Sequence, residues 1–438
     1  MSTTKLARFL SYAAVTILLL IPFQALLTTW LGANFGHIDL FRIWKELLLA
    51  PLTVGSLYLV YSDKKLKKWF VDSKLVLLVL VYVLLQLGLA SFALSSGRVN
   101  NSAVIYAVMI NLRFFIFFLV CLVLAAKSDW LGKNWTKYIL WPAVAVVVFG
   151  LIQHFILPNN FLSHFGYGPK TIPAYQAVDR KPQYIRLQST LRGANPLGAY
   201  LVIVMTALTA LWLRTKKRLW LSVTLVATLI ALYFTYSRSA WLGALLGCLL
   251  VAFWSFNDSK TRQRLIIGSL VSLAILGGAV LIWQRNSVIE NTLFHTSQTS
   301  QSLESSNAVR TEAMLDGAKS VWHDPVGGGP GTAGPASFRN SHPARIAENY
   351  FIQVGQEVGV VGLAVFIAIN SYVGVLLWRA RDNYLAKIAL AALIGLTMVN
   401  LLSHAWADDT LAYVYWGLAG IALAPSVILN KERKPKDA

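Results

Sequence analysis

The chain is short of charged residues and of cysteine. Only 13% of its 438 residues are charged, whereas a soluble protein usually has about 25%. Its two cysteines, Cys121 and Cys248, both lie inside apolar stretches, so the sequence supports neither a disulfide framework nor a thiolate metal site. The scarcity of charge excludes an ordinary soluble protein and makes an integral membrane protein the expected class.

Apolar residues are abundant instead, and they are grouped. They make up 56% of the chain and fall in blocks of about 20 residues, the length with which a helix crosses a hydrocarbon core of about 30 Å. We therefore expect an all-α fold, a polytopic transmembrane helix bundle of about twelve spans in one membrane domain. The first block follows Lys5 and Arg8 and is expected to remain as a signal anchor. The expected spans are about 9–31, 43–61, 75–94, 108–126, 138–157, 195–213, 219–236, 239–256, 265–284, 350–378, 388–404 and 410–429.

The basic residues predict the orientation. The net charge of +20 would elsewhere indicate a nucleic-acid partner, but in a membrane protein Lys and Arg concentrate in cytoplasmic loops. With the N-terminus inside, the cytoplasmic segments hold 24 of the 39 Lys and Arg residues. Both termini are then expected in the cytoplasm, and two long loops, at about 158–194 and 285–349, are expected outside.

Arginine dominates the other side of the predicted topology. Of the 15 basic residues placed there, 11 are Arg, a bias that topology does not require. Because the planar guanidinium can hold two phosphate oxygens at once, this pattern favours an anionic, phosphate-bearing ligand. Contact with lipid headgroups, or ion pairing with outer acids, is the alternative. The 11 residues are Arg42, Arg98, Arg113, Arg180, Arg186, Arg192, Arg238, Arg285, Arg310, Arg339 and Arg345.

Two candidate binding segments come before residue 250. Asn195 and Pro196 open a predicted helix beside Arg186 and Arg192, and a helix N-terminus favours an anion. An ordinary cap by Asn195 explains the same residues. Arg238 lies in a tight hairpin near membrane depth, where an ionisable residue indicates function, unless its side chain merely extends to the interface.

Two more candidate segments lie in and after the second long loop. Arg310 begins a predicted short amphipathic outer helix at 310–322, which leads into a glycine-rich stretch at 325–334 that is either an anion-binding nest or a flexible connector. Glu348 lies where this loop meets the membrane, a place that can prepare a carboxylate to act as a base. It is otherwise a charge that complements a helix dipole. His342 is a second candidate base, or a solvated loop histidine.

One group of residues near the C-terminus could suggest a metal site. His404, Asp408 and Asp409 lie near an expected outer loop, but two adjacent acids and a separate imidazole are a poor ligand set. We predict no metal.

Together these segments, in this order, resemble the O-antigen ligase and O-antigen polymerase superfamily of bacterial envelope glycan transferases. The resemblance rests on Asn-Pro-Leu-Gly-Ala-Tyr at 195–200, Ser-Arg-Ser-Ala-Trp at 237–241, the stretch from Arg310 to Thr332, and Glu-Asn-Tyr-Phe-Ile-Gln with the following glycines at 348–362. It implies an inverting glycosyltransferase of the bacterial inner membrane that works without metal or cofactor. Its donor would be a polyprenyl-pyrophosphate-linked glycan and its acceptor a glycan or a lipid-linked molecule. The ligase pattern has His-Asn where this chain has Glu348-Asn349, which favours a polymerase.

The expected roles follow from this resemblance and from the chemistry of the residues. Arg238 and Arg310 would hold the pyrophosphate, with Arg186 or Arg192 assisting and Asn195 and Asn349 contributing to the substrate site. Glu348, or His342 in its place, would deprotonate the acceptor hydroxyl. A transporter or flippase for a lipid-linked anionic glycan is the alternative, but the polar residues gather at the outer ends of the spans, which favours surface chemistry.

Overall fold

The structure is a computed structural model. It describes residues 3–178, 181–215, 218–256, 258, 260, 263–264 and 306–429. The predicted span at 265–284, and the predicted outer residues Arg180 and Arg285, lie outside the described residues.

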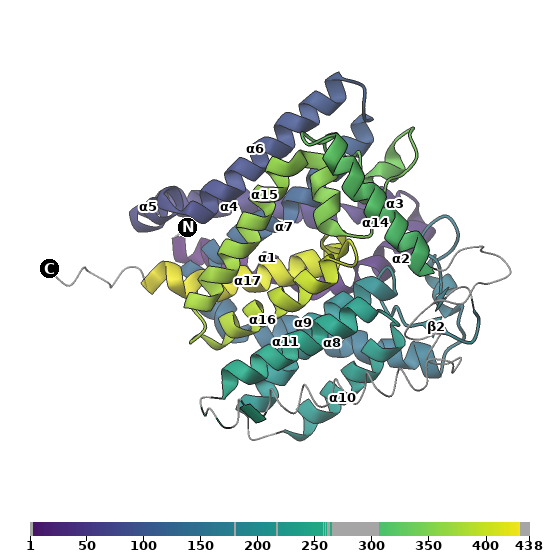
Figure 1. The fold of residues 1–438 in the computed structure, drawn as a ribbon. Coiled ribbons are helices and arrows are strands. Elements are labelled where there is room, and N and C mark those ends of the chain that lie inside the picture. The colour runs from purple at the N-terminus through teal and green to yellow at the C-terminus, as the bar shows by residue number, and fades with distance from the viewer. Residues whose placement is uncertain are drawn as a thin grey trace, which may run out of the picture.

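The described part of the chain is almost entirely helical (Figure 1). A two-stranded antiparallel pair, β1 (Gln176–Ala177) with β2 (Ile185–Arg186), is its small β component. The α-helices are α1 (Thr3–Leu20), α2 (Gln24–Phe35), α3 (Ile38–Arg42), α4 (Trp44–Ser62), α5 (Lys64–Asp72), α6 (Lys74–Ser95), α7 (Asn101–Lys127), α8 (Trp130–Phe155), α9 (Ala194–Arg214), α10 (Leu219–Phe234), α11 (Arg238–Ser255), α14 (Ser306–His323), α15 (Tyr350–Arg379), α16 (Tyr384–Asn400) and α17 (Asp409–Leu429). Short 3₁₀ helices are η1 (Ile21–Phe23), η2 (Phe161–Phe165), η5 (Gly334–Arg339) and η6 (Ala405–Ala407).

The long helices coincide with the apolar blocks of the sequence. Among the described residues, seven helices are long and apolar enough to cross a membrane, and two shorter apolar helices, α10 and α16, accompany them. The chain is therefore a multi-pass helical membrane protein, while the predicted count of about twelve spans is not confirmed. The first apolar block is not one continuous α-helix, because η1, with Pro22 inside it, separates α1 from α2.

Small residues bring the central helices together. A Cβ atom added at Gly417 of α17 would lie 2.7 Å from the Phe117 ring of α7, and one at Gly243 of α11 would lie 2.6 Å from the Gly395 carbonyl oxygen of α16. Close backbone approach through small residues is how helices associate where no hydrophobic driving force distinguishes lipid from protein. The pairing of Gly243 with Gly395 also aligns the start of α11 with the end of α16.

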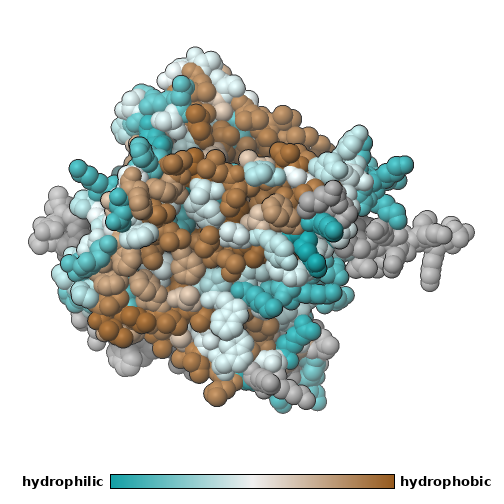
Figure 2. All heavy atoms as spheres, turned by 180° about the vertical axis from the view of Figure 1, so that it is seen from behind, coloured by the Kyte–Doolittle hydropathy of each residue, from teal (hydrophilic) through white to brown (hydrophobic). Residues whose placement is uncertain are grey.

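The surface agrees with a membrane bundle. Hydrophobic side chains cover the middle of the molecule, and hydrophilic ones gather toward its two ends (Figure 2). The start of α1 and the end of α17 lie at the same end, and α14 and the β1–β2 pair lie toward the opposite end (Figure 1). The polar loops that connect the helices are therefore available to build a site at this second end.

The glycine-rich stretch at 325–334 is bound firmly to a break in α15. Gly359 has a left-handed φ of 68° inside this helix, and the Val360 N–H donates to the Pro325 carbonyl oxygen at 2.8 Å. The Gly331 N–H donates to the Glu357 carboxylate at 2.8 Å, and the Gly329 N–H to the Glu357 carbonyl oxygen at 2.9 Å. The carboxyl group that this turn holds is thus a side chain of the protein itself, and these hydrogen bonds fix the turn against α15, so it is not a free connector.

Candidate active site where the α15 and α17 loops meet

Two loops that are far apart in the sequence are joined directly before α15 and after α16. The Asn349 Nδ2 donates to the Leu401 carbonyl oxygen at 2.8 Å, and the Tyr350 N–H donates to the Ser403 carbonyl oxygen at 3.2 Å. The Asn349 side chain also accepts from the Ile352 N–H at 3.0 Å, which caps α15. Asn349 therefore positions the start of the helix and its neighbouring loop.

Glu348 occupies a strained position at this junction. Its φ of 51° lies in the left-handed region, which a residue with a side chain rarely adopts. Such conformations persist where the surrounding contacts demand them, and they concentrate at functional sites. The contacts of Asn349 and Tyr350 supply that demand, so the direction of the Glu348 side chain is set by the junction.

Arg310 reaches Glu348 from another element. Its Nε lies 3.8 Å from the Glu348 Oε2. α14 carries Arg310 and packs closely against the start of α15, since a Cβ at Gly317 would lie 2.7 Å from the Ile352 side chain. The Arg310 and Glu348 side chains are 36% and 27% exposed, so both remain accessible to a ligand. The structure thus brings together two of the residues predicted from the sequence.

His404 and Arg192 complete this cluster. Burial lowers the pKa of His404, the Glu348 charge raises it, and the Arg192 and Arg310 charges lower it further, leaving it below the ordinary 6.5. His404 directly follows Ser403, whose carbonyl oxygen accepts from the Tyr350 N–H, so it lies on the loop beside Glu348. The Arg192 Nε lies 3.8 Å from the Asp408 Oδ2. We call Arg192, Arg310, Glu348, His404 and Asp408 the loop cluster.

Arg238 lies at the same end of the bundle. It is the first residue of α11, five residues before Gly243, while Asn400 ends α16 five residues after Gly395. The close contact of Gly243 with Gly395 therefore places the start of α11 opposite the end of α16, where the loop that carries His404 and Asp408 begins.

Arg186 and Asn195 contact each other beside α11. The Arg186 Nη2 donates to the Asn195 Oδ1 at 2.6 Å, and its Nε donates to the Thr235 carbonyl oxygen at 2.9 Å. α9 begins at Ala194 with Gly193 in the cap position. The expectation that Asn195 caps this helix is therefore wrong, because its side-chain oxygen accepts from Arg186 instead.

His342 lies apart from the buried contacts of the junction. It is exposed in the segment between η5 and α15. Of the two bases predicted from the sequence, Glu348 is the one that the structure places beside Arg310 and His404.

Several of the outer arginines form ion pairs with acids, as the alternative interpretation required. Arg42 pairs with Asp39 at 3.1 Å, and Arg98 pairs with Asp324 at 3.2 Å. Arg113 is buried between α4 and α17, so its charge is used within the bundle. Ion pairing therefore accounts for part of the arginine bias, and these arginines are not free for a ligand.

The buried Arg113 and its partners form a second group, which we call the inner network: Gln24, Lys45, Glu46, Arg113 and Asp409. The Lys45 Nζ lies 3.1 Å from Glu46 and 3.0 Å from Asp409. Arg113 lies 3.3 Å from Glu46 and also contacts Asp409. The Gln24 Nε2 donates to Asp409 at 2.6 Å. Two cations face two carboxylates, so the charges of this network balance.

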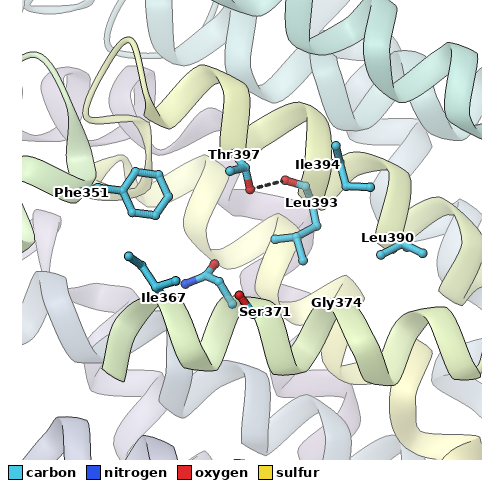
Figure 3. Close-up of a pocket in the computed structure, with 9 residues that line it drawn as sticks. Phe351, Ile367, Ser371, Gly374, Leu390, Leu393, Ile394 and Thr397 are labelled. Carbon is cyan, nitrogen blue, oxygen red and sulfur yellow. Dashed lines mark hydrogen bonds between the residues drawn. The ribbon is translucent and has the colours of Figure 1, made fainter. Parts of the chain in front are cut away.

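A cavity of about 230 Å³ starts beside the junction and runs between α15 and α16 (Figure 3). Phe351, in the first turn of α15, lines it at one end, and Ile367, Gly374, Leu390 and Leu393 line it further along. Its few polar groups include Thr397, whose hydroxyl is already used in a 2.8 Å bond to the Leu393 carbonyl oxygen. The walls therefore suit a hydrocarbon chain.

Sequence reasoning missed His404 as a member of the site. The sequence places His404 beside two acids and suggests only a poor metal ligand. Glu348 and Arg310 are distant from it in the chain, so no local pattern links them to this histidine. The only sequence signal was its position at an outer helix end, between a polar Ser403 and two acids.

Comparison with known proteins supports the resemblance. The family model described as O-antigen ligase matches residues 223–367. This segment includes Arg238, Arg310, His342, Glu348 and Asn349, whereas Arg186, Arg192 and His404 lie outside it. No curated protein matches the chain.

Proposed function

We propose that this chain, whose residues 223–367 match the O-antigen ligase family model, belongs to the O-antigen ligase and O-antigen polymerase superfamily. It would transfer a glycan from a polyprenyl-pyrophosphate carrier to an acceptor hydroxyl at the outer face of the inner membrane. The observation that carries the proposal is the loop cluster. It combines two accessible arginines, a strained carboxylate and an imidazole at one end of a membrane bundle. Both termini would then be cytoplasmic, which agrees with the start of α1 and the end of α17 lying at one end of the bundle (Figure 1).

The arginines would act on the leaving group. During transfer, the bond between the anomeric carbon and the phosphate oxygen breaks, and the bonding electrons pass to the pyrophosphate. Fixed positive charges that face this growing negative charge lower the barrier, and they do so more effectively away from bulk water. Arg310 and Arg192 are suited to this task in the loop cluster, with Arg238 and Arg186 acting from the adjoining start of α11 and end of β2.

Glu348 would act on the acceptor. The incoming hydroxyl forms its bond to the anomeric carbon while it loses a proton, and a positioned base contributes roughly 10²–10⁴-fold to such a step. A direct attack opposite the leaving group inverts the anomeric carbon. No metal or cofactor has a part in this scheme.

The cavity between α15 and α16 supports a lipid-linked donor. It begins at Phe351, three residues after Glu348, and continues along the apolar sides of two membrane helices. A donor whose pyrophosphate lies at the loop cluster would therefore have an apolar path for its polyprenyl chain. A phosphate-bearing ligand without a lipid would have no use for it.

The experiment that tests the proposal uses the purified full chain in detergent or vesicles. A polyprenyl-pyrophosphate oligosaccharide is added with candidate acceptors, and released polyprenyl pyrophosphate and the product mass are measured. A longer lipid-linked glycan supports a polymerase, and a glycan attached to lipid A core supports a ligase. Movement of the donor across the vesicle without formation of a glycosidic bond would contradict the proposal and favour a flippase.

A further inference from the structure

His404 is placed among the groups that the proposed transfer uses, although the family match does not reach it. The charged groups that act on it are Glu348 from the loop before α15, Arg310 from α14 and Arg192 from the loop before α9. The loop that carries His404 is bound to the start of α15, directly after Glu348, through Leu401 and Ser403, which lie three residues and one residue before the histidine. Its position is therefore coupled to that of the proposed base.

One nitrogen of this imidazole is left without a partner. His404 Nδ1 is buried and has no hydrogen-bond partner among the described residues. A buried polar atom without a partner is costly, and in a native protein it calls for an explanation such as a catalytic role. The backbone of the same residue is engaged, because the Ala407 N–H donates to its carbonyl oxygen at 3.2 Å. The loop is thus ordered while the ring retains an unused site for a proton.

A carboxylate by itself is a poor final acceptor for a proton at neutral pH. An imidazole is ordinarily a stronger base than a carboxylate, and the Glu348 charge favours the protonated form of His404, so the imidazole can take up a proton that the carboxylate has accepted. Burial and the two arginines keep His404 neutral at pH 7, which is the form that can accept. Once protonated, the imidazolium would face the recovered Glu348 carboxylate.

We propose that His404 is a second proton-transfer residue of this site, which receives from Glu348 the proton that the acceptor hydroxyl loses. The inference rests on the proposed function. As the hydroxyl oxygen bonds to the anomeric carbon, its proton moves to a Glu348 oxygen and the pyrophosphate leaves with the electrons of the broken bond. The proton then passes to a ring nitrogen of His404 and from there to water, which restores Glu348 for the next turnover.

The pH dependence of transfer tests this role. If His404 is already protonated, its charge weakens Glu348 as a proton acceptor, so the wild-type rate falls as the pH falls through the lowered pKa of His404. The H404Q variant keeps a polar side chain of similar size but cannot titrate. We expect its kcat at pH 7.5 to be lower by about 10²-fold and its KM for the donor to be unchanged. The decrease of its transfer rate at acid pH should be lost.

Added imidazole gives a second measurement. The H404A variant leaves space beside Glu348, and free imidazole in the buffer should restore transfer in proportion to the fraction that is neutral. The matched control is H164Q, a change of an exposed histidine in the segment after α8, which should keep the wild-type rate and pH profile. A residue that merely held the loop in place would give neither rescue by imidazole nor loss of the acid-side fall.

The outcomes separate this inference from the proposed function. Wild-type protein that forms no glycosidic bond from a polyprenyl-pyrophosphate oligosaccharide contradicts the proposed function itself. Active wild-type protein, together with H404Q that retains the wild-type kcat and acid-side fall, overturns the role of His404 alone. If H404A does not fold, the H404Q profile decides the question.

Discussion

The inner network and the loop cluster contain the same kinds of residue and differ in how completely they are paired. In the inner network, Lys45 lies 3.1 Å from Glu46 and 3.0 Å from Asp409, Arg113 lies 3.3 Å from Glu46, and both cations are 3% exposed. In the loop cluster, the two ion pairs are 3.8 Å long and the arginines are 36% and 43% exposed. The comparison teaches that charge near a membrane indicates a ligand site only where the protein leaves that charge accessible.

The largest expected effect comes from opening the inner network. R113A removes one cation and leaves Glu46 and Asp409 with too little compensating charge in a buried place. Breaking a buried pair in this way is expected to destabilise the fold by about 3–5 kcal/mol, which thermal unfolding of the detergent-purified protein would measure. If R113A unfolds at the wild-type temperature, the inner network is not a structural element and the contrast fails.

The next effect is on catalysis at the loop cluster. R310A removes an accessible ion pair, which contributes only about 0–1 kcal/mol to stability, but it removes a charge that would face the leaving pyrophosphate. We expect kcat to fall by about 10²–10³-fold with little change in thermal stability. The matched control is R42A, because Arg42 also pairs with an acid, Asp39, at 39% exposure. Equal loss of activity in both variants would show that the loop cluster is not special.

Arg238 tests how far the site extends beyond the loop cluster. We expect the transfer rate of R238A to fall roughly 10²-fold. Its insertion into the membrane should remain normal, as measured by its yield in the membrane fraction. R238K retains the charge but not the planar fork, so it should recover only part of the rate. Undiminished transfer by R238A would remove Arg238 from the mechanism.

The smallest effect concerns the apolar cavity. Gly374 has its nearest neighbour, a Leu393 methyl group, 3.6 Å from the place of a Cβ, so G374L would extend into the cavity without displacing the backbone. Excluding about two methylene groups of a polyprenyl chain, each worth about 0.8 kcal/mol, should raise KM for a long-chain donor about tenfold. A donor with a short prenyl chain should be affected much less.

A leucine elsewhere on the lipid-facing surface is the control for this cavity. Gly88 of α6 has no atom within 4 Å of the place of a Cβ, so G88L adds the same side chain outside the cavity and should leave both donors unaffected. If G374L and G88L behave alike, the polyprenyl chain lies elsewhere.

Much of the helical arrangement was predictable, because membrane spans are defined by length and apolar character within one segment. The blocks predicted at 75–94, 195–213 and 350–378 correspond to α6, α9 and α15 with shifts of a few residues at most. The candidate site was predictable only in part. Arg310 and Glu348 do meet, but Asn195 binds Arg186 rather than capping its helix, and a carboxylate from α15 occupies the glycine-rich turn. These partners come from distant segments, so no local pattern could reveal them.

By itself, the sequence determined that this protein is a helical membrane protein with arginine-rich loops, since hydrophobic length and residue type act locally along the chain. Only the tertiary structure decided which arginines are used up and which stay accessible. Whether a guanidinium meets a carboxylate at hydrogen-bonding distance depends on helices that approach through Gly243, Gly317 and Gly417 and on loops tied together by Asn349. Charge pairing acts through space, and this is why Arg113 is enclosed within the bundle while Arg310 stays accessible to a ligand.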